Sequence, residues 1–393
     1  MKIIDLIEQN NDYRSSCLNM IVSENILSSD VKKALSLQHS RYHAEIYGGT
    51  ELFRQIYTQT EALTKRVFRC NSAFISPLSG NMSLLAVIHA FTQLRDKVAI
   101  LPLASGGYPL NISFFGRKKV NIPFNTNEFN IDLTNTLEML EREKPKLVCL
   151  GASLILFPQP VQAISQAVHD YGGVVAYDGS HVLGLIAGGQ FQDPLKEGAD
   201  LLLGSTHKSF PGPQGGLVLS NGFHDEKLDE VIGIDPLEGI VFVDNIHNSR
   251  IAALGVALEE FQKFGHEYAR QVIKNSKTLA RTLDLNEIPL HGKFKGFTNS
   301  HQVLMQIKDY EEGRKFRDAL LEYKIVTDGL MRFGTAELTR IGFGNEEMQR
   351  LGNIIAKIVH HSSGTQPLPP EKLNEIKEQI ETLLAIIRRK SIY

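Results

Sequence analysis

The sequence predicts an α/β protein with a mostly parallel sheet sandwiched between helices and a smaller α+β domain at its C-terminal end. Seven short apolar runs rich in β-forming residues recur between residues 73 and 220, separated by stretches long enough for helices. Most runs are continuously apolar rather than alternating, which is typical of strands buried on both faces of a parallel sheet. Alternation of strands and helices favours the same architecture. The predicted strands are 73–79, 97–103, 120–124, 147–153, 173–178, 201–206 and 215–220.

Beyond residue 248 the pattern changes to helical spacing. Apolar side chains repeat every three or four residues over 248–274, which predicts a long helix, and over 373–387, which predicts a final amphipathic helix. Between them, 303–307 has the composition of a strand and 313–323 that of a helix. We therefore expect a helical N-terminal arm, a large α/β domain, and a linking helix followed by a small α+β domain. The expected ranges are 1–50, 51–247 and 248–393.

The composition is that of an ordinary soluble globular protein long enough for two domains, with 393 residues, 42% hydrophobic and 22% charged. A net charge of −2 gives no electrostatic reason to expect nucleic acid or an anionic membrane surface as a partner. The scattered Cys17, Cys70 and Cys149 favour a reducing compartment over a disulfide framework. No stretch reaches membrane-spanning length, and the N-terminus lacks the apolar core of a signal peptide. We therefore expect a cytoplasmic protein with small-molecule partners.

Lys208 is the candidate nucleophile. It follows Thr206-His207 and precedes Ser209, directly before a turn rich in glycine and proline. A lysine in such a setting can have a lowered pKa, so that its neutral amine adds to an aldehyde. Asp178 ends an earlier apolar run, and a carboxylate there can keep the ring nitrogen of pyridoxal 5′-phosphate protonated. The two residues together predict an enzyme that uses this cofactor, although a surface lysine and a helix-capping aspartate are the plain alternatives.

Other polar side chains follow the ends of predicted strands, where active residues of parallel sheets gather. Ser79-Gly80-Asn81 precedes a predicted helix, whose N-terminal amides can bind phosphate. His181 could contact the cofactor's phenolic oxygen or the substrate, or be an ordinary hydrogen-bonded histidine. Ser205 and His207 are further candidate cofactor contacts.

An arginine in the predicted C-terminal domain is the candidate for binding a substrate carboxylate. Arg332 lies in the apolar segment Met331-Arg332-Phe333, where a guanidinium needs an anionic partner. The alternatives are an internal salt bridge, or the same role for Arg340. No Gly-x-x-x-x-Gly precedes Lys208, which excludes a P-loop there, and the chain lacks a dinucleotide fingerprint, a Gly-x-Ser-x-Gly elbow and metal-ligand spacing.

Ordered motifs across most of the chain resemble those of the serine hydroxymethyltransferase family, enzymes of the pyridoxal-phosphate fold type I. The matching segments are 21–25, 43–45, 47–49, 76–81, 101–107, 178–185, 206–216, 332–335 and 338–340. The resemblance implies a cofactor-linked Lys208, an Asp178 at the ring nitrogen, and His181 and Ser153 near the phenolic oxygen. It implies that Arg332, aided by Ser23, binds the substrate carboxylate.

The resemblance also implies a homodimer with shared active sites. Glu45 is similar to the glutamate that handles the proton of the substrate's side-chain hydroxyl. Tyr47 is similar to an active-site tyrosine contributed across the dimer interface. The implied chemistry is the making or breaking of a Cα–Cβ bond in glycine, serine or a related β-hydroxy amino acid, with an aldehyde or a one-carbon carrier as the second substrate.

The chain departs from the family pattern in several places. Tyr108 stands where the family stacks a histidine on the cofactor ring, and Gln214 replaces an arginine. Between Glu45 and Tyr47 the chain is several residues shorter and lacks one tyrosine of a pair; a longer family loop before Arg332 is nearly absent. The family's phosphate-proximal Gly-Gly has no clear match near 237–239.

The shortened segments leave three interpretations open. The first is one-carbon transfer with tetrahydrofolate or a pterin. The second is a folate-independent β-hydroxy-amino-acid aldolase or threonine transaldolase that uses another aldehyde. The third is a paralogue that binds pyridoxal phosphate without turnover, against which the joint presence of Lys208, Asp178, Arg332 and Glu45 argues.

Overall fold

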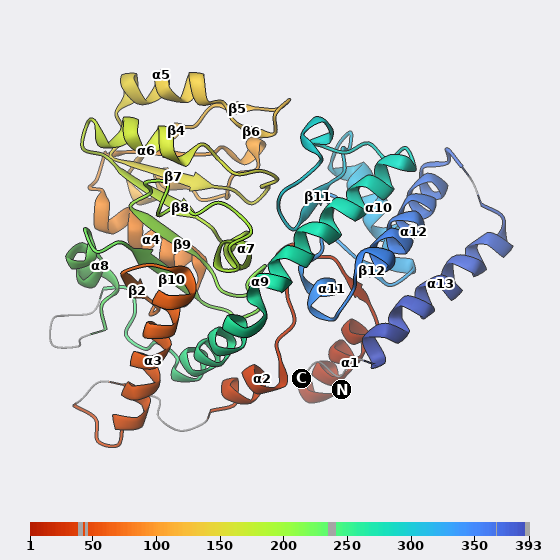
Figure 1. Ribbon diagram of the computed structural model, residues 1–393, viewed down its shortest axis with the longest axis horizontal. Helices are drawn as coiled ribbons and strands as arrows, with labels where there is room; N and C mark the ends of the chain where they lie inside the picture. The colour runs from red at the N-terminus through yellow and green to blue at the C-terminus, as the bar shows by residue number, and fades with distance from the viewer. Residues whose placement is uncertain (38–41, 44–45, 235–240, 367, 390–393) are drawn as a thin grey trace. The chain divides into compact units, whose positions relative to one another are not determined.

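The computed structural model describes residues 1–37, 42–43, 46–234, 241–366 and 368–389 (Figure 1). The chain forms two compact units, a large unit of residues 27–269 and a small unit of residues 1–26 and 270–393. Each unit has its own cluster of buried apolar side chains. The domain boundaries at 50 and 247 that the sequence suggests stay a prediction.

A seven-stranded sheet forms the centre of the large unit, and each of the seven predicted runs overlaps one of its strands. The strand order is β2-β10-β9-β8-β7-β3-β4, and only β10 runs antiparallel to its neighbours. The predicted mostly parallel α/β fold is therefore confirmed. The strands are β2 (Ser72–Phe74), β3 (Lys97–Ile100), β4 (Lys118–Asn121), β7 (Leu147–Gly151), β8 (Val174–Asp178), β9 (Leu201–Ser205) and β10 (Gly216–Ser220).

Helices cover both faces of this sheet, which explains why its strands are continuously apolar (Figure 1). Leu147 and Cys149 of β7 share a buried cluster with side chains of α4 and α8, and the alternating Val148 and Leu150 are equally buried on the opposite face. Helix α6 packs on β8. The remaining elements of this unit are α2 (Ser29–Leu35), α3 (Glu51–Phe68), α4 (Gly80–Phe91), η1 (Leu103–Ser105), η2 (Ile112–Phe115), β5 (Phe124–Asn125), β6 (Asn130–Ile131), α5 (Leu133–Glu143), α6 (Val161–His169), α7 (Leu183–Ala187) and α8 (Asp225–Ile232).

The long helix α9 (Asn248–Leu285) belongs to both units and extends beyond the predicted 248–274. In the small unit, β11 (Gln302–Leu304) pairs with β13 (Arg332–Gly334), and β1 (Leu18–Asn19) pairs with β12 (Ile325–Val326). Helices pack around these short strands through a cluster of buried side chains that includes Phe333, Leu351 and Leu384. They are α1 (Ile3–Ser15), η3 (Lys293–Lys295), α10 (Tyr310–Glu322), α11 (Ala336–Arg340), α12 (Asn345–Ser363) and α13 (Pro370–Arg389).

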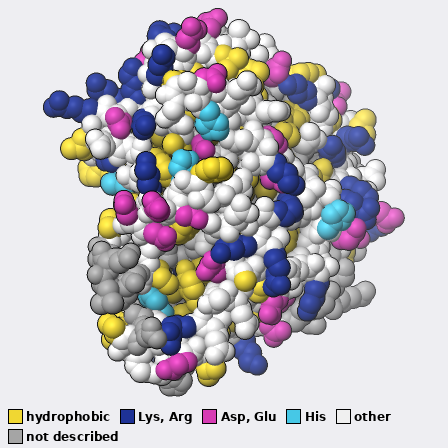
Figure 2. All heavy atoms as spheres, turned by 60° about the vertical axis from the view of Figure 1, so that its left-hand side comes forward, with side chains coloured by type: hydrophobic (Ala, Val, Ile, Leu, Met, Phe, Trp, Pro, Cys, Tyr) yellow, Lys and Arg dark blue, Asp and Glu magenta, His cyan; other side chains and the backbone are white. Residues whose placement is uncertain are grey.

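Charges of both signs are mixed on the surface, and the cysteines are unpaired, as the near-zero net charge and the scattered cysteines lead us to expect. Figure 2 shows lysine and arginine side chains interspersed with aspartate and glutamate on one face of the molecule. Cys17, Cys70 and Cys149 are buried free thiols. Among the described residues, no helix combines the length and apolar character that a membrane span requires.

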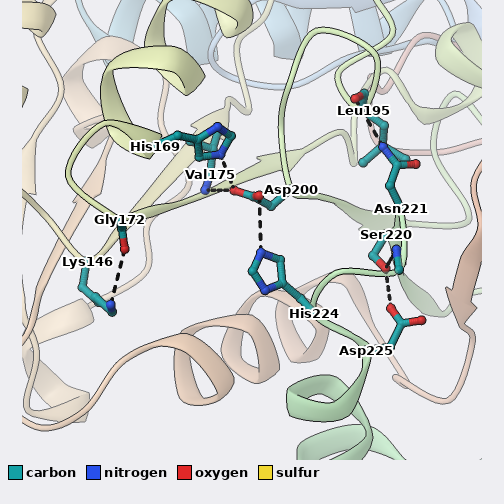
Figure 3. Close-up of polar contacts among 11 residues, drawn as sticks. Lys146, His169, Gly172, Val175, Leu195, Asp200, Ser220, Asn221, His224 and Asp225 are labelled. Atoms are coloured by element: carbon teal, nitrogen blue, oxygen red, sulfur yellow. Dashed lines mark hydrogen bonds and ion pairs between the residues drawn. The ribbon is translucent and has the colours of Figure 1, made fainter.

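Asp200 ties together the amino-terminal edge of the sheet (Figure 3). Its carboxylate accepts the Val175 amide at 2.7 Å and lies 3.0 Å from Nε2 of His169 and 3.3 Å from Nε2 of His224. Burial by itself would raise the pKa of Asp200, but hydrogen bonds from His224, the Val175 amide and His169 hold it below its usual value. The carboxylate therefore links the end of α6, the start of β8 and the turn before α8.

Replacing Asp200 with asparagine should lower the free energy of unfolding near neutral pH by about 1–3 kcal/mol, because the amide and both imidazoles lose their charged acceptor. A depressed pKa contributes stability that is present above the unfolded pKa, about 4, and is lost as the pH falls through the folded value. Denaturant unfolding should therefore show a gap between wild type and variant that closes in acid. Asp170→Asn, at the neighbouring exposed carboxylate, should have little effect; an equal loss there, or a gap independent of pH, would contradict the interpretation.

Candidate active site

The candidate site lies at the carboxyl edge of the sheet, where β7, β8 and β9 end together. The register places Gly151 opposite Asp178, and Asp178 opposite Leu203, close to the end of β9. A cavity of about 250 Å³ opens at this edge. It brings together every residue predicted to contact the cofactor, which are Ser79, Gly80, Asn81, Tyr108, Ser153, Asp178, His181, Ser205, His207 and Lys208.

Lys208 lies in a loop whose backbone is held on both sides. The loop is closed before the lysine by Thr206, whose hydroxyl donates to the Pro213 carbonyl at 2.6 Å. After the lysine, the Tyr268 hydroxyl donates to the Ser209 carbonyl at 2.9 Å. The Lys208 Nζ lies 3.4 Å from Nε2 of His181. The amine is therefore fixed in the cavity next to an imidazole.

Asp178 ends β8 and faces the same cavity. Its Oδ1 accepts the Ser180 amide at 2.9 Å, which fixes the carboxylate beside the strand end. Burial, together with the charge of Asp178, raises the pKa of the Tyr108 hydroxyl, so this side chain stays protonated well into the alkaline range. The same two causes raise the pKa of the Cys149 thiol far above its usual value, which fits a core thiol rather than a nucleophile.

The N-terminus of α4 forms one wall of the cavity. Ser79 caps this helix with its hydroxyl, which accepts the Met82 amide at 3.1 Å. The amides of Gly80 and Asn81 precede the intrahelical ladder and have no helical acceptor. A Cβ on Gly80 would lie 2.3 Å from the Ser205 Oγ and 3.1 Å from the Ser180 Oγ, so glycine lets the helix start approach β9. This arrangement is a typical anion cradle.

His207 is held neutral beside Lys208. Burial and the charge of Lys208 lower the pKa of His207 to about 4. Its Nδ1 is buried and has no hydrogen-bond partner among the described residues, which is costly for a buried polar atom unless a bound group completes it. An orphaned nitrogen, an amine, a carboxylate and a helix-terminal anion cradle in one cavity fit pyridoxal 5′-phosphate, which presents an aldehyde, a ring nitrogen and a phosphate.

The other predicted site residues lie outside this cavity or cannot be placed. Tyr47 is exposed and stacks on Tyr42 with ring centroids 4.5 Å apart. Arg332 and Ser23 belong to the small unit, where the Arg332 Nε pairs with Asp328 at 2.6 Å. Glu45 lies outside the described residues. The roles of these four side chains stay predictions.

Supporting residues are visible only in the structure. Gly151 has a φ of +90°, and a Cβ there would lie 2.0 Å from the Asp178 carbonyl, so only glycine allows β7 to end against β8. The Gln159 side chain accepts the Gly151 amide at 2.7 Å and fixes this turn. Ser180 could have been found as a strand-end hydroxyl, but Tyr268, which is far from Lys208 in sequence, carries no local signal.

Comparison with known proteins gives one consistent answer. The family model for serine hydroxymethyltransferase matches residues 1–355. The serine hydroxymethyltransferase of Methanopyrus kandleri is 34% identical, with 97% of this chain and 92% of that protein covered. That of Methanothermobacter marburgensis is 36% identical, with 91% and 89% covered. The crystal structure of L-threonine transaldolase from Pseudomonas fluorescens superposes with a TM-score of 0.85 at 25% identity and covers 98% of this chain and 91% of that one.

Replacing Tyr108 with histidine should add a pH transition that the wild type lacks. A tyrosine hydroxyl, with an ordinary pKa of about 10, is neutral throughout the physiological range, and the raised pKa of Tyr108 extends this range further. An imidazole, with an ordinary pKa of about 6.5, would gain a proton as the pH falls, and the nearby Asp178 would favour the charged form. The absorbance of the bound cofactor, followed from acid to alkaline pH, should show this transition in Tyr108→His only. Tyr108→Phe keeps an aromatic ring without a titrating group and serves as the control. A matching transition in this variant would contradict the placement of residue 108 beside the cofactor.

Proposed function

The chain belongs to the serine hydroxymethyltransferase family, and from this membership we propose that it interconverts serine and glycine through the Cα–Cβ bond. It is a pyridoxal-phosphate enzyme of the fold type I. The observation that supports the proposal most directly is the grouping of Lys208, Asp178 and the α4 N-terminus around one cavity. When bound, pyridoxal phosphate supplies a ring that accepts the electrons released at Cα.

The residues of the large unit are proposed to bind and tune the cofactor. Lys208 holds it through the ε-amine, and Asp178 holds the proton at the ring nitrogen. The amides of Gly80 and Asn81 bind the phosphate at the helix N-terminus. His207, kept neutral by burial and by Lys208, lines the cavity without adding a second positive charge.

The substrate contacts are proposed from the matching motifs. Arg332, aided by Ser23, binds the amino-acid carboxylate, for which a guanidinium is the suited partner. Glu45 moves the proton of the β-hydroxyl as a general acid–base. The one-carbon acceptor is proposed to be tetrahydrofolate or a pterin, and the compartment to be the cytoplasm.

A second candidate is transfer of the glycine unit to another aldehyde without folate. The segments shortened around Glu45–Tyr47 and before Arg332 are those that help hold folate in the family. The likeness to an L-threonine transaldolase over 98% of the chain supports the same alternative. Both candidates use the cavity residues in the same way and differ in the second substrate.

The two candidates separate in one assay of the holoenzyme. With serine, we expect glycine to form many times faster when tetrahydrofolate is present, because folate removes the one-carbon unit. Lys208→Ala should abolish this turnover in either case and serves as the control. Glycine formation from serine that is indifferent to folate, together with cleavage of threonine, would replace the first candidate with the second.

A homodimer is proposed for the active form. Apolar and aromatic side chains are exposed at the end of α2, at the start of α3 and at described residues between them, and exposed apolar surface is typical of an interface. They are Leu35, Leu37, Tyr42, Ile46, Tyr47, Leu52 and Ile56. Sedimentation should give twice the chain mass of 43.9 kDa, and Leu52→Glu should shift the protein toward monomer; a wild-type enzyme that is active as a monomer would contradict the shared site.

A further inference from the structure

We propose that Asp328 is a positioning residue for the substrate-binding guanidinium of Arg332. The inference rests on the proposed function of Arg332 and deepens it. In the small unit, the Oδ2 of Asp328 lies 2.6 Å from the Nε of Arg332. This is the distance of a strong charge-assisted hydrogen bond.

The same carboxylate also shapes the turn that leads into β13. Its Oδ1 accepts the Leu330 amide at 3.0 Å and the Arg332 amide at 3.3 Å. The Asp328 carbonyl accepts the Met331 amide at 3.0 Å. One side chain therefore fixes both the backbone and the guanidinium of Arg332.

Packing holds this turn in a conformation that is uncommon for its residues. Met331 has a φ of +53°, which is rare for a residue other than glycine, and its side chain is fully buried. The Met331 carbonyl accepts the Met305 amide at 3.1 Å. The Thr327 hydroxyl donates to the Arg332 carbonyl at 2.6 Å. These contacts leave the backbone of Arg332 little freedom, and the bond from Asp328 to Nε helps to fix where its side chain points.

The bond to Asp328 occupies the Nε edge of the guanidinium. Because Asp328 engages Nε, a substrate carboxylate would be contacted by the terminal Nη nitrogens, in the end-on forked geometry that arginine favours. The two side chains are 16% and 21% exposed, so their attraction is less screened than that of a surface pair. The segment from Lys324 to Arg332 is short in this chain, and the Asp328 contacts hold its last residues in place.

The test uses two ligands that differ only in the carboxylate. Glycine carries it and methylamine does not, and the binding of either to the holoenzyme changes the absorbance of the cofactor. Asp328→Ala should weaken glycine binding by about tenfold or more, since a misplaced guanidinium loses its directed contact, and should leave methylamine binding unchanged. In the steady state, KM for serine should rise while kcat stays within about threefold.

Asp328→Asn keeps an acceptor for the backbone amides but loses the charge at Nε, so it should fold like wild type and show a smaller effect in the same direction. Asp309→Ala removes a carboxylate that caps α10 in the same unit, where its Oδ1 accepts the Glu312 amide at 2.9 Å, and should leave both ligands unaffected.

The outcomes distinguish the positioning role of Asp328 from the carboxylate-binding role of Arg332 on which it rests. If Arg332→Ala weakens glycine binding while both Asp328 variants bind glycine as wild type does, Asp328 has no positioning role. Equal losses for glycine and methylamine in Asp328→Asn would also overturn the inference, because they would show general damage. If Arg332→Ala itself leaves glycine binding unchanged, the carboxylate-binding role of Arg332 fails.

Discussion

The register between β7, β8 and β9 is the constraint on which the candidate site depends. Parallel pairing brings Gly151, Asp178 and the end of β9 to one edge, although they are far apart in the sequence. Gly151 and Gly80 make this possible, since a side chain at either position would collide with the neighbouring strand end or with Ser205. The cavity exists because the backbone comes this close on two sides.

Burial then decides the charge of the groups around the cavity. Tyr108 and Cys149 are protonated near neutral pH, and desolvation and the nearby Asp178 raise the pKa of each further. His207 is kept neutral in the opposite way, because burial and Lys208 both disfavour its added proton. These neutral groups leave the field around the cofactor site to the amine, the carboxylate and the imidazole of His181.

In the small unit, a candidate ligand-binding side chain is also held in place by a neighbour. Its short strands place Arg332 at the start of β13, and Asp328 directs the guanidinium through a bond to Nε. A long flexible side chain loses conformational entropy when it binds a ligand. A charge-assisted hydrogen bond that already holds the side chain before binding reduces this entropy loss. In each unit, a neighbouring residue that is not expected to touch the ligand holds the ligand-binding group in place. Tyr268 does so for the Lys208 loop and Asp328 for Arg332.

The sheet and the candidate cofactor residues could be predicted from the chain alone. Continuous apolar runs report burial on two faces, and a polar residue that ends such a run must lie at the edge of the sheet, which is why Asp178 and Ser205 could be predicted. The ordered motifs identified the family, because each preserves a local arrangement of side chains. The three-dimensional structure was needed to show that Tyr268 braces the Lys208 loop, that Ser205 requires a glycine at position 80, and that Asp328 holds Arg332. Contacts to Tyr268 and Gly80 join segments that are distant along the chain, and the pairing of Asp328 with Arg332 is one of several that an arginine in this segment could make, so the sequence carries no periodic signal for any of them.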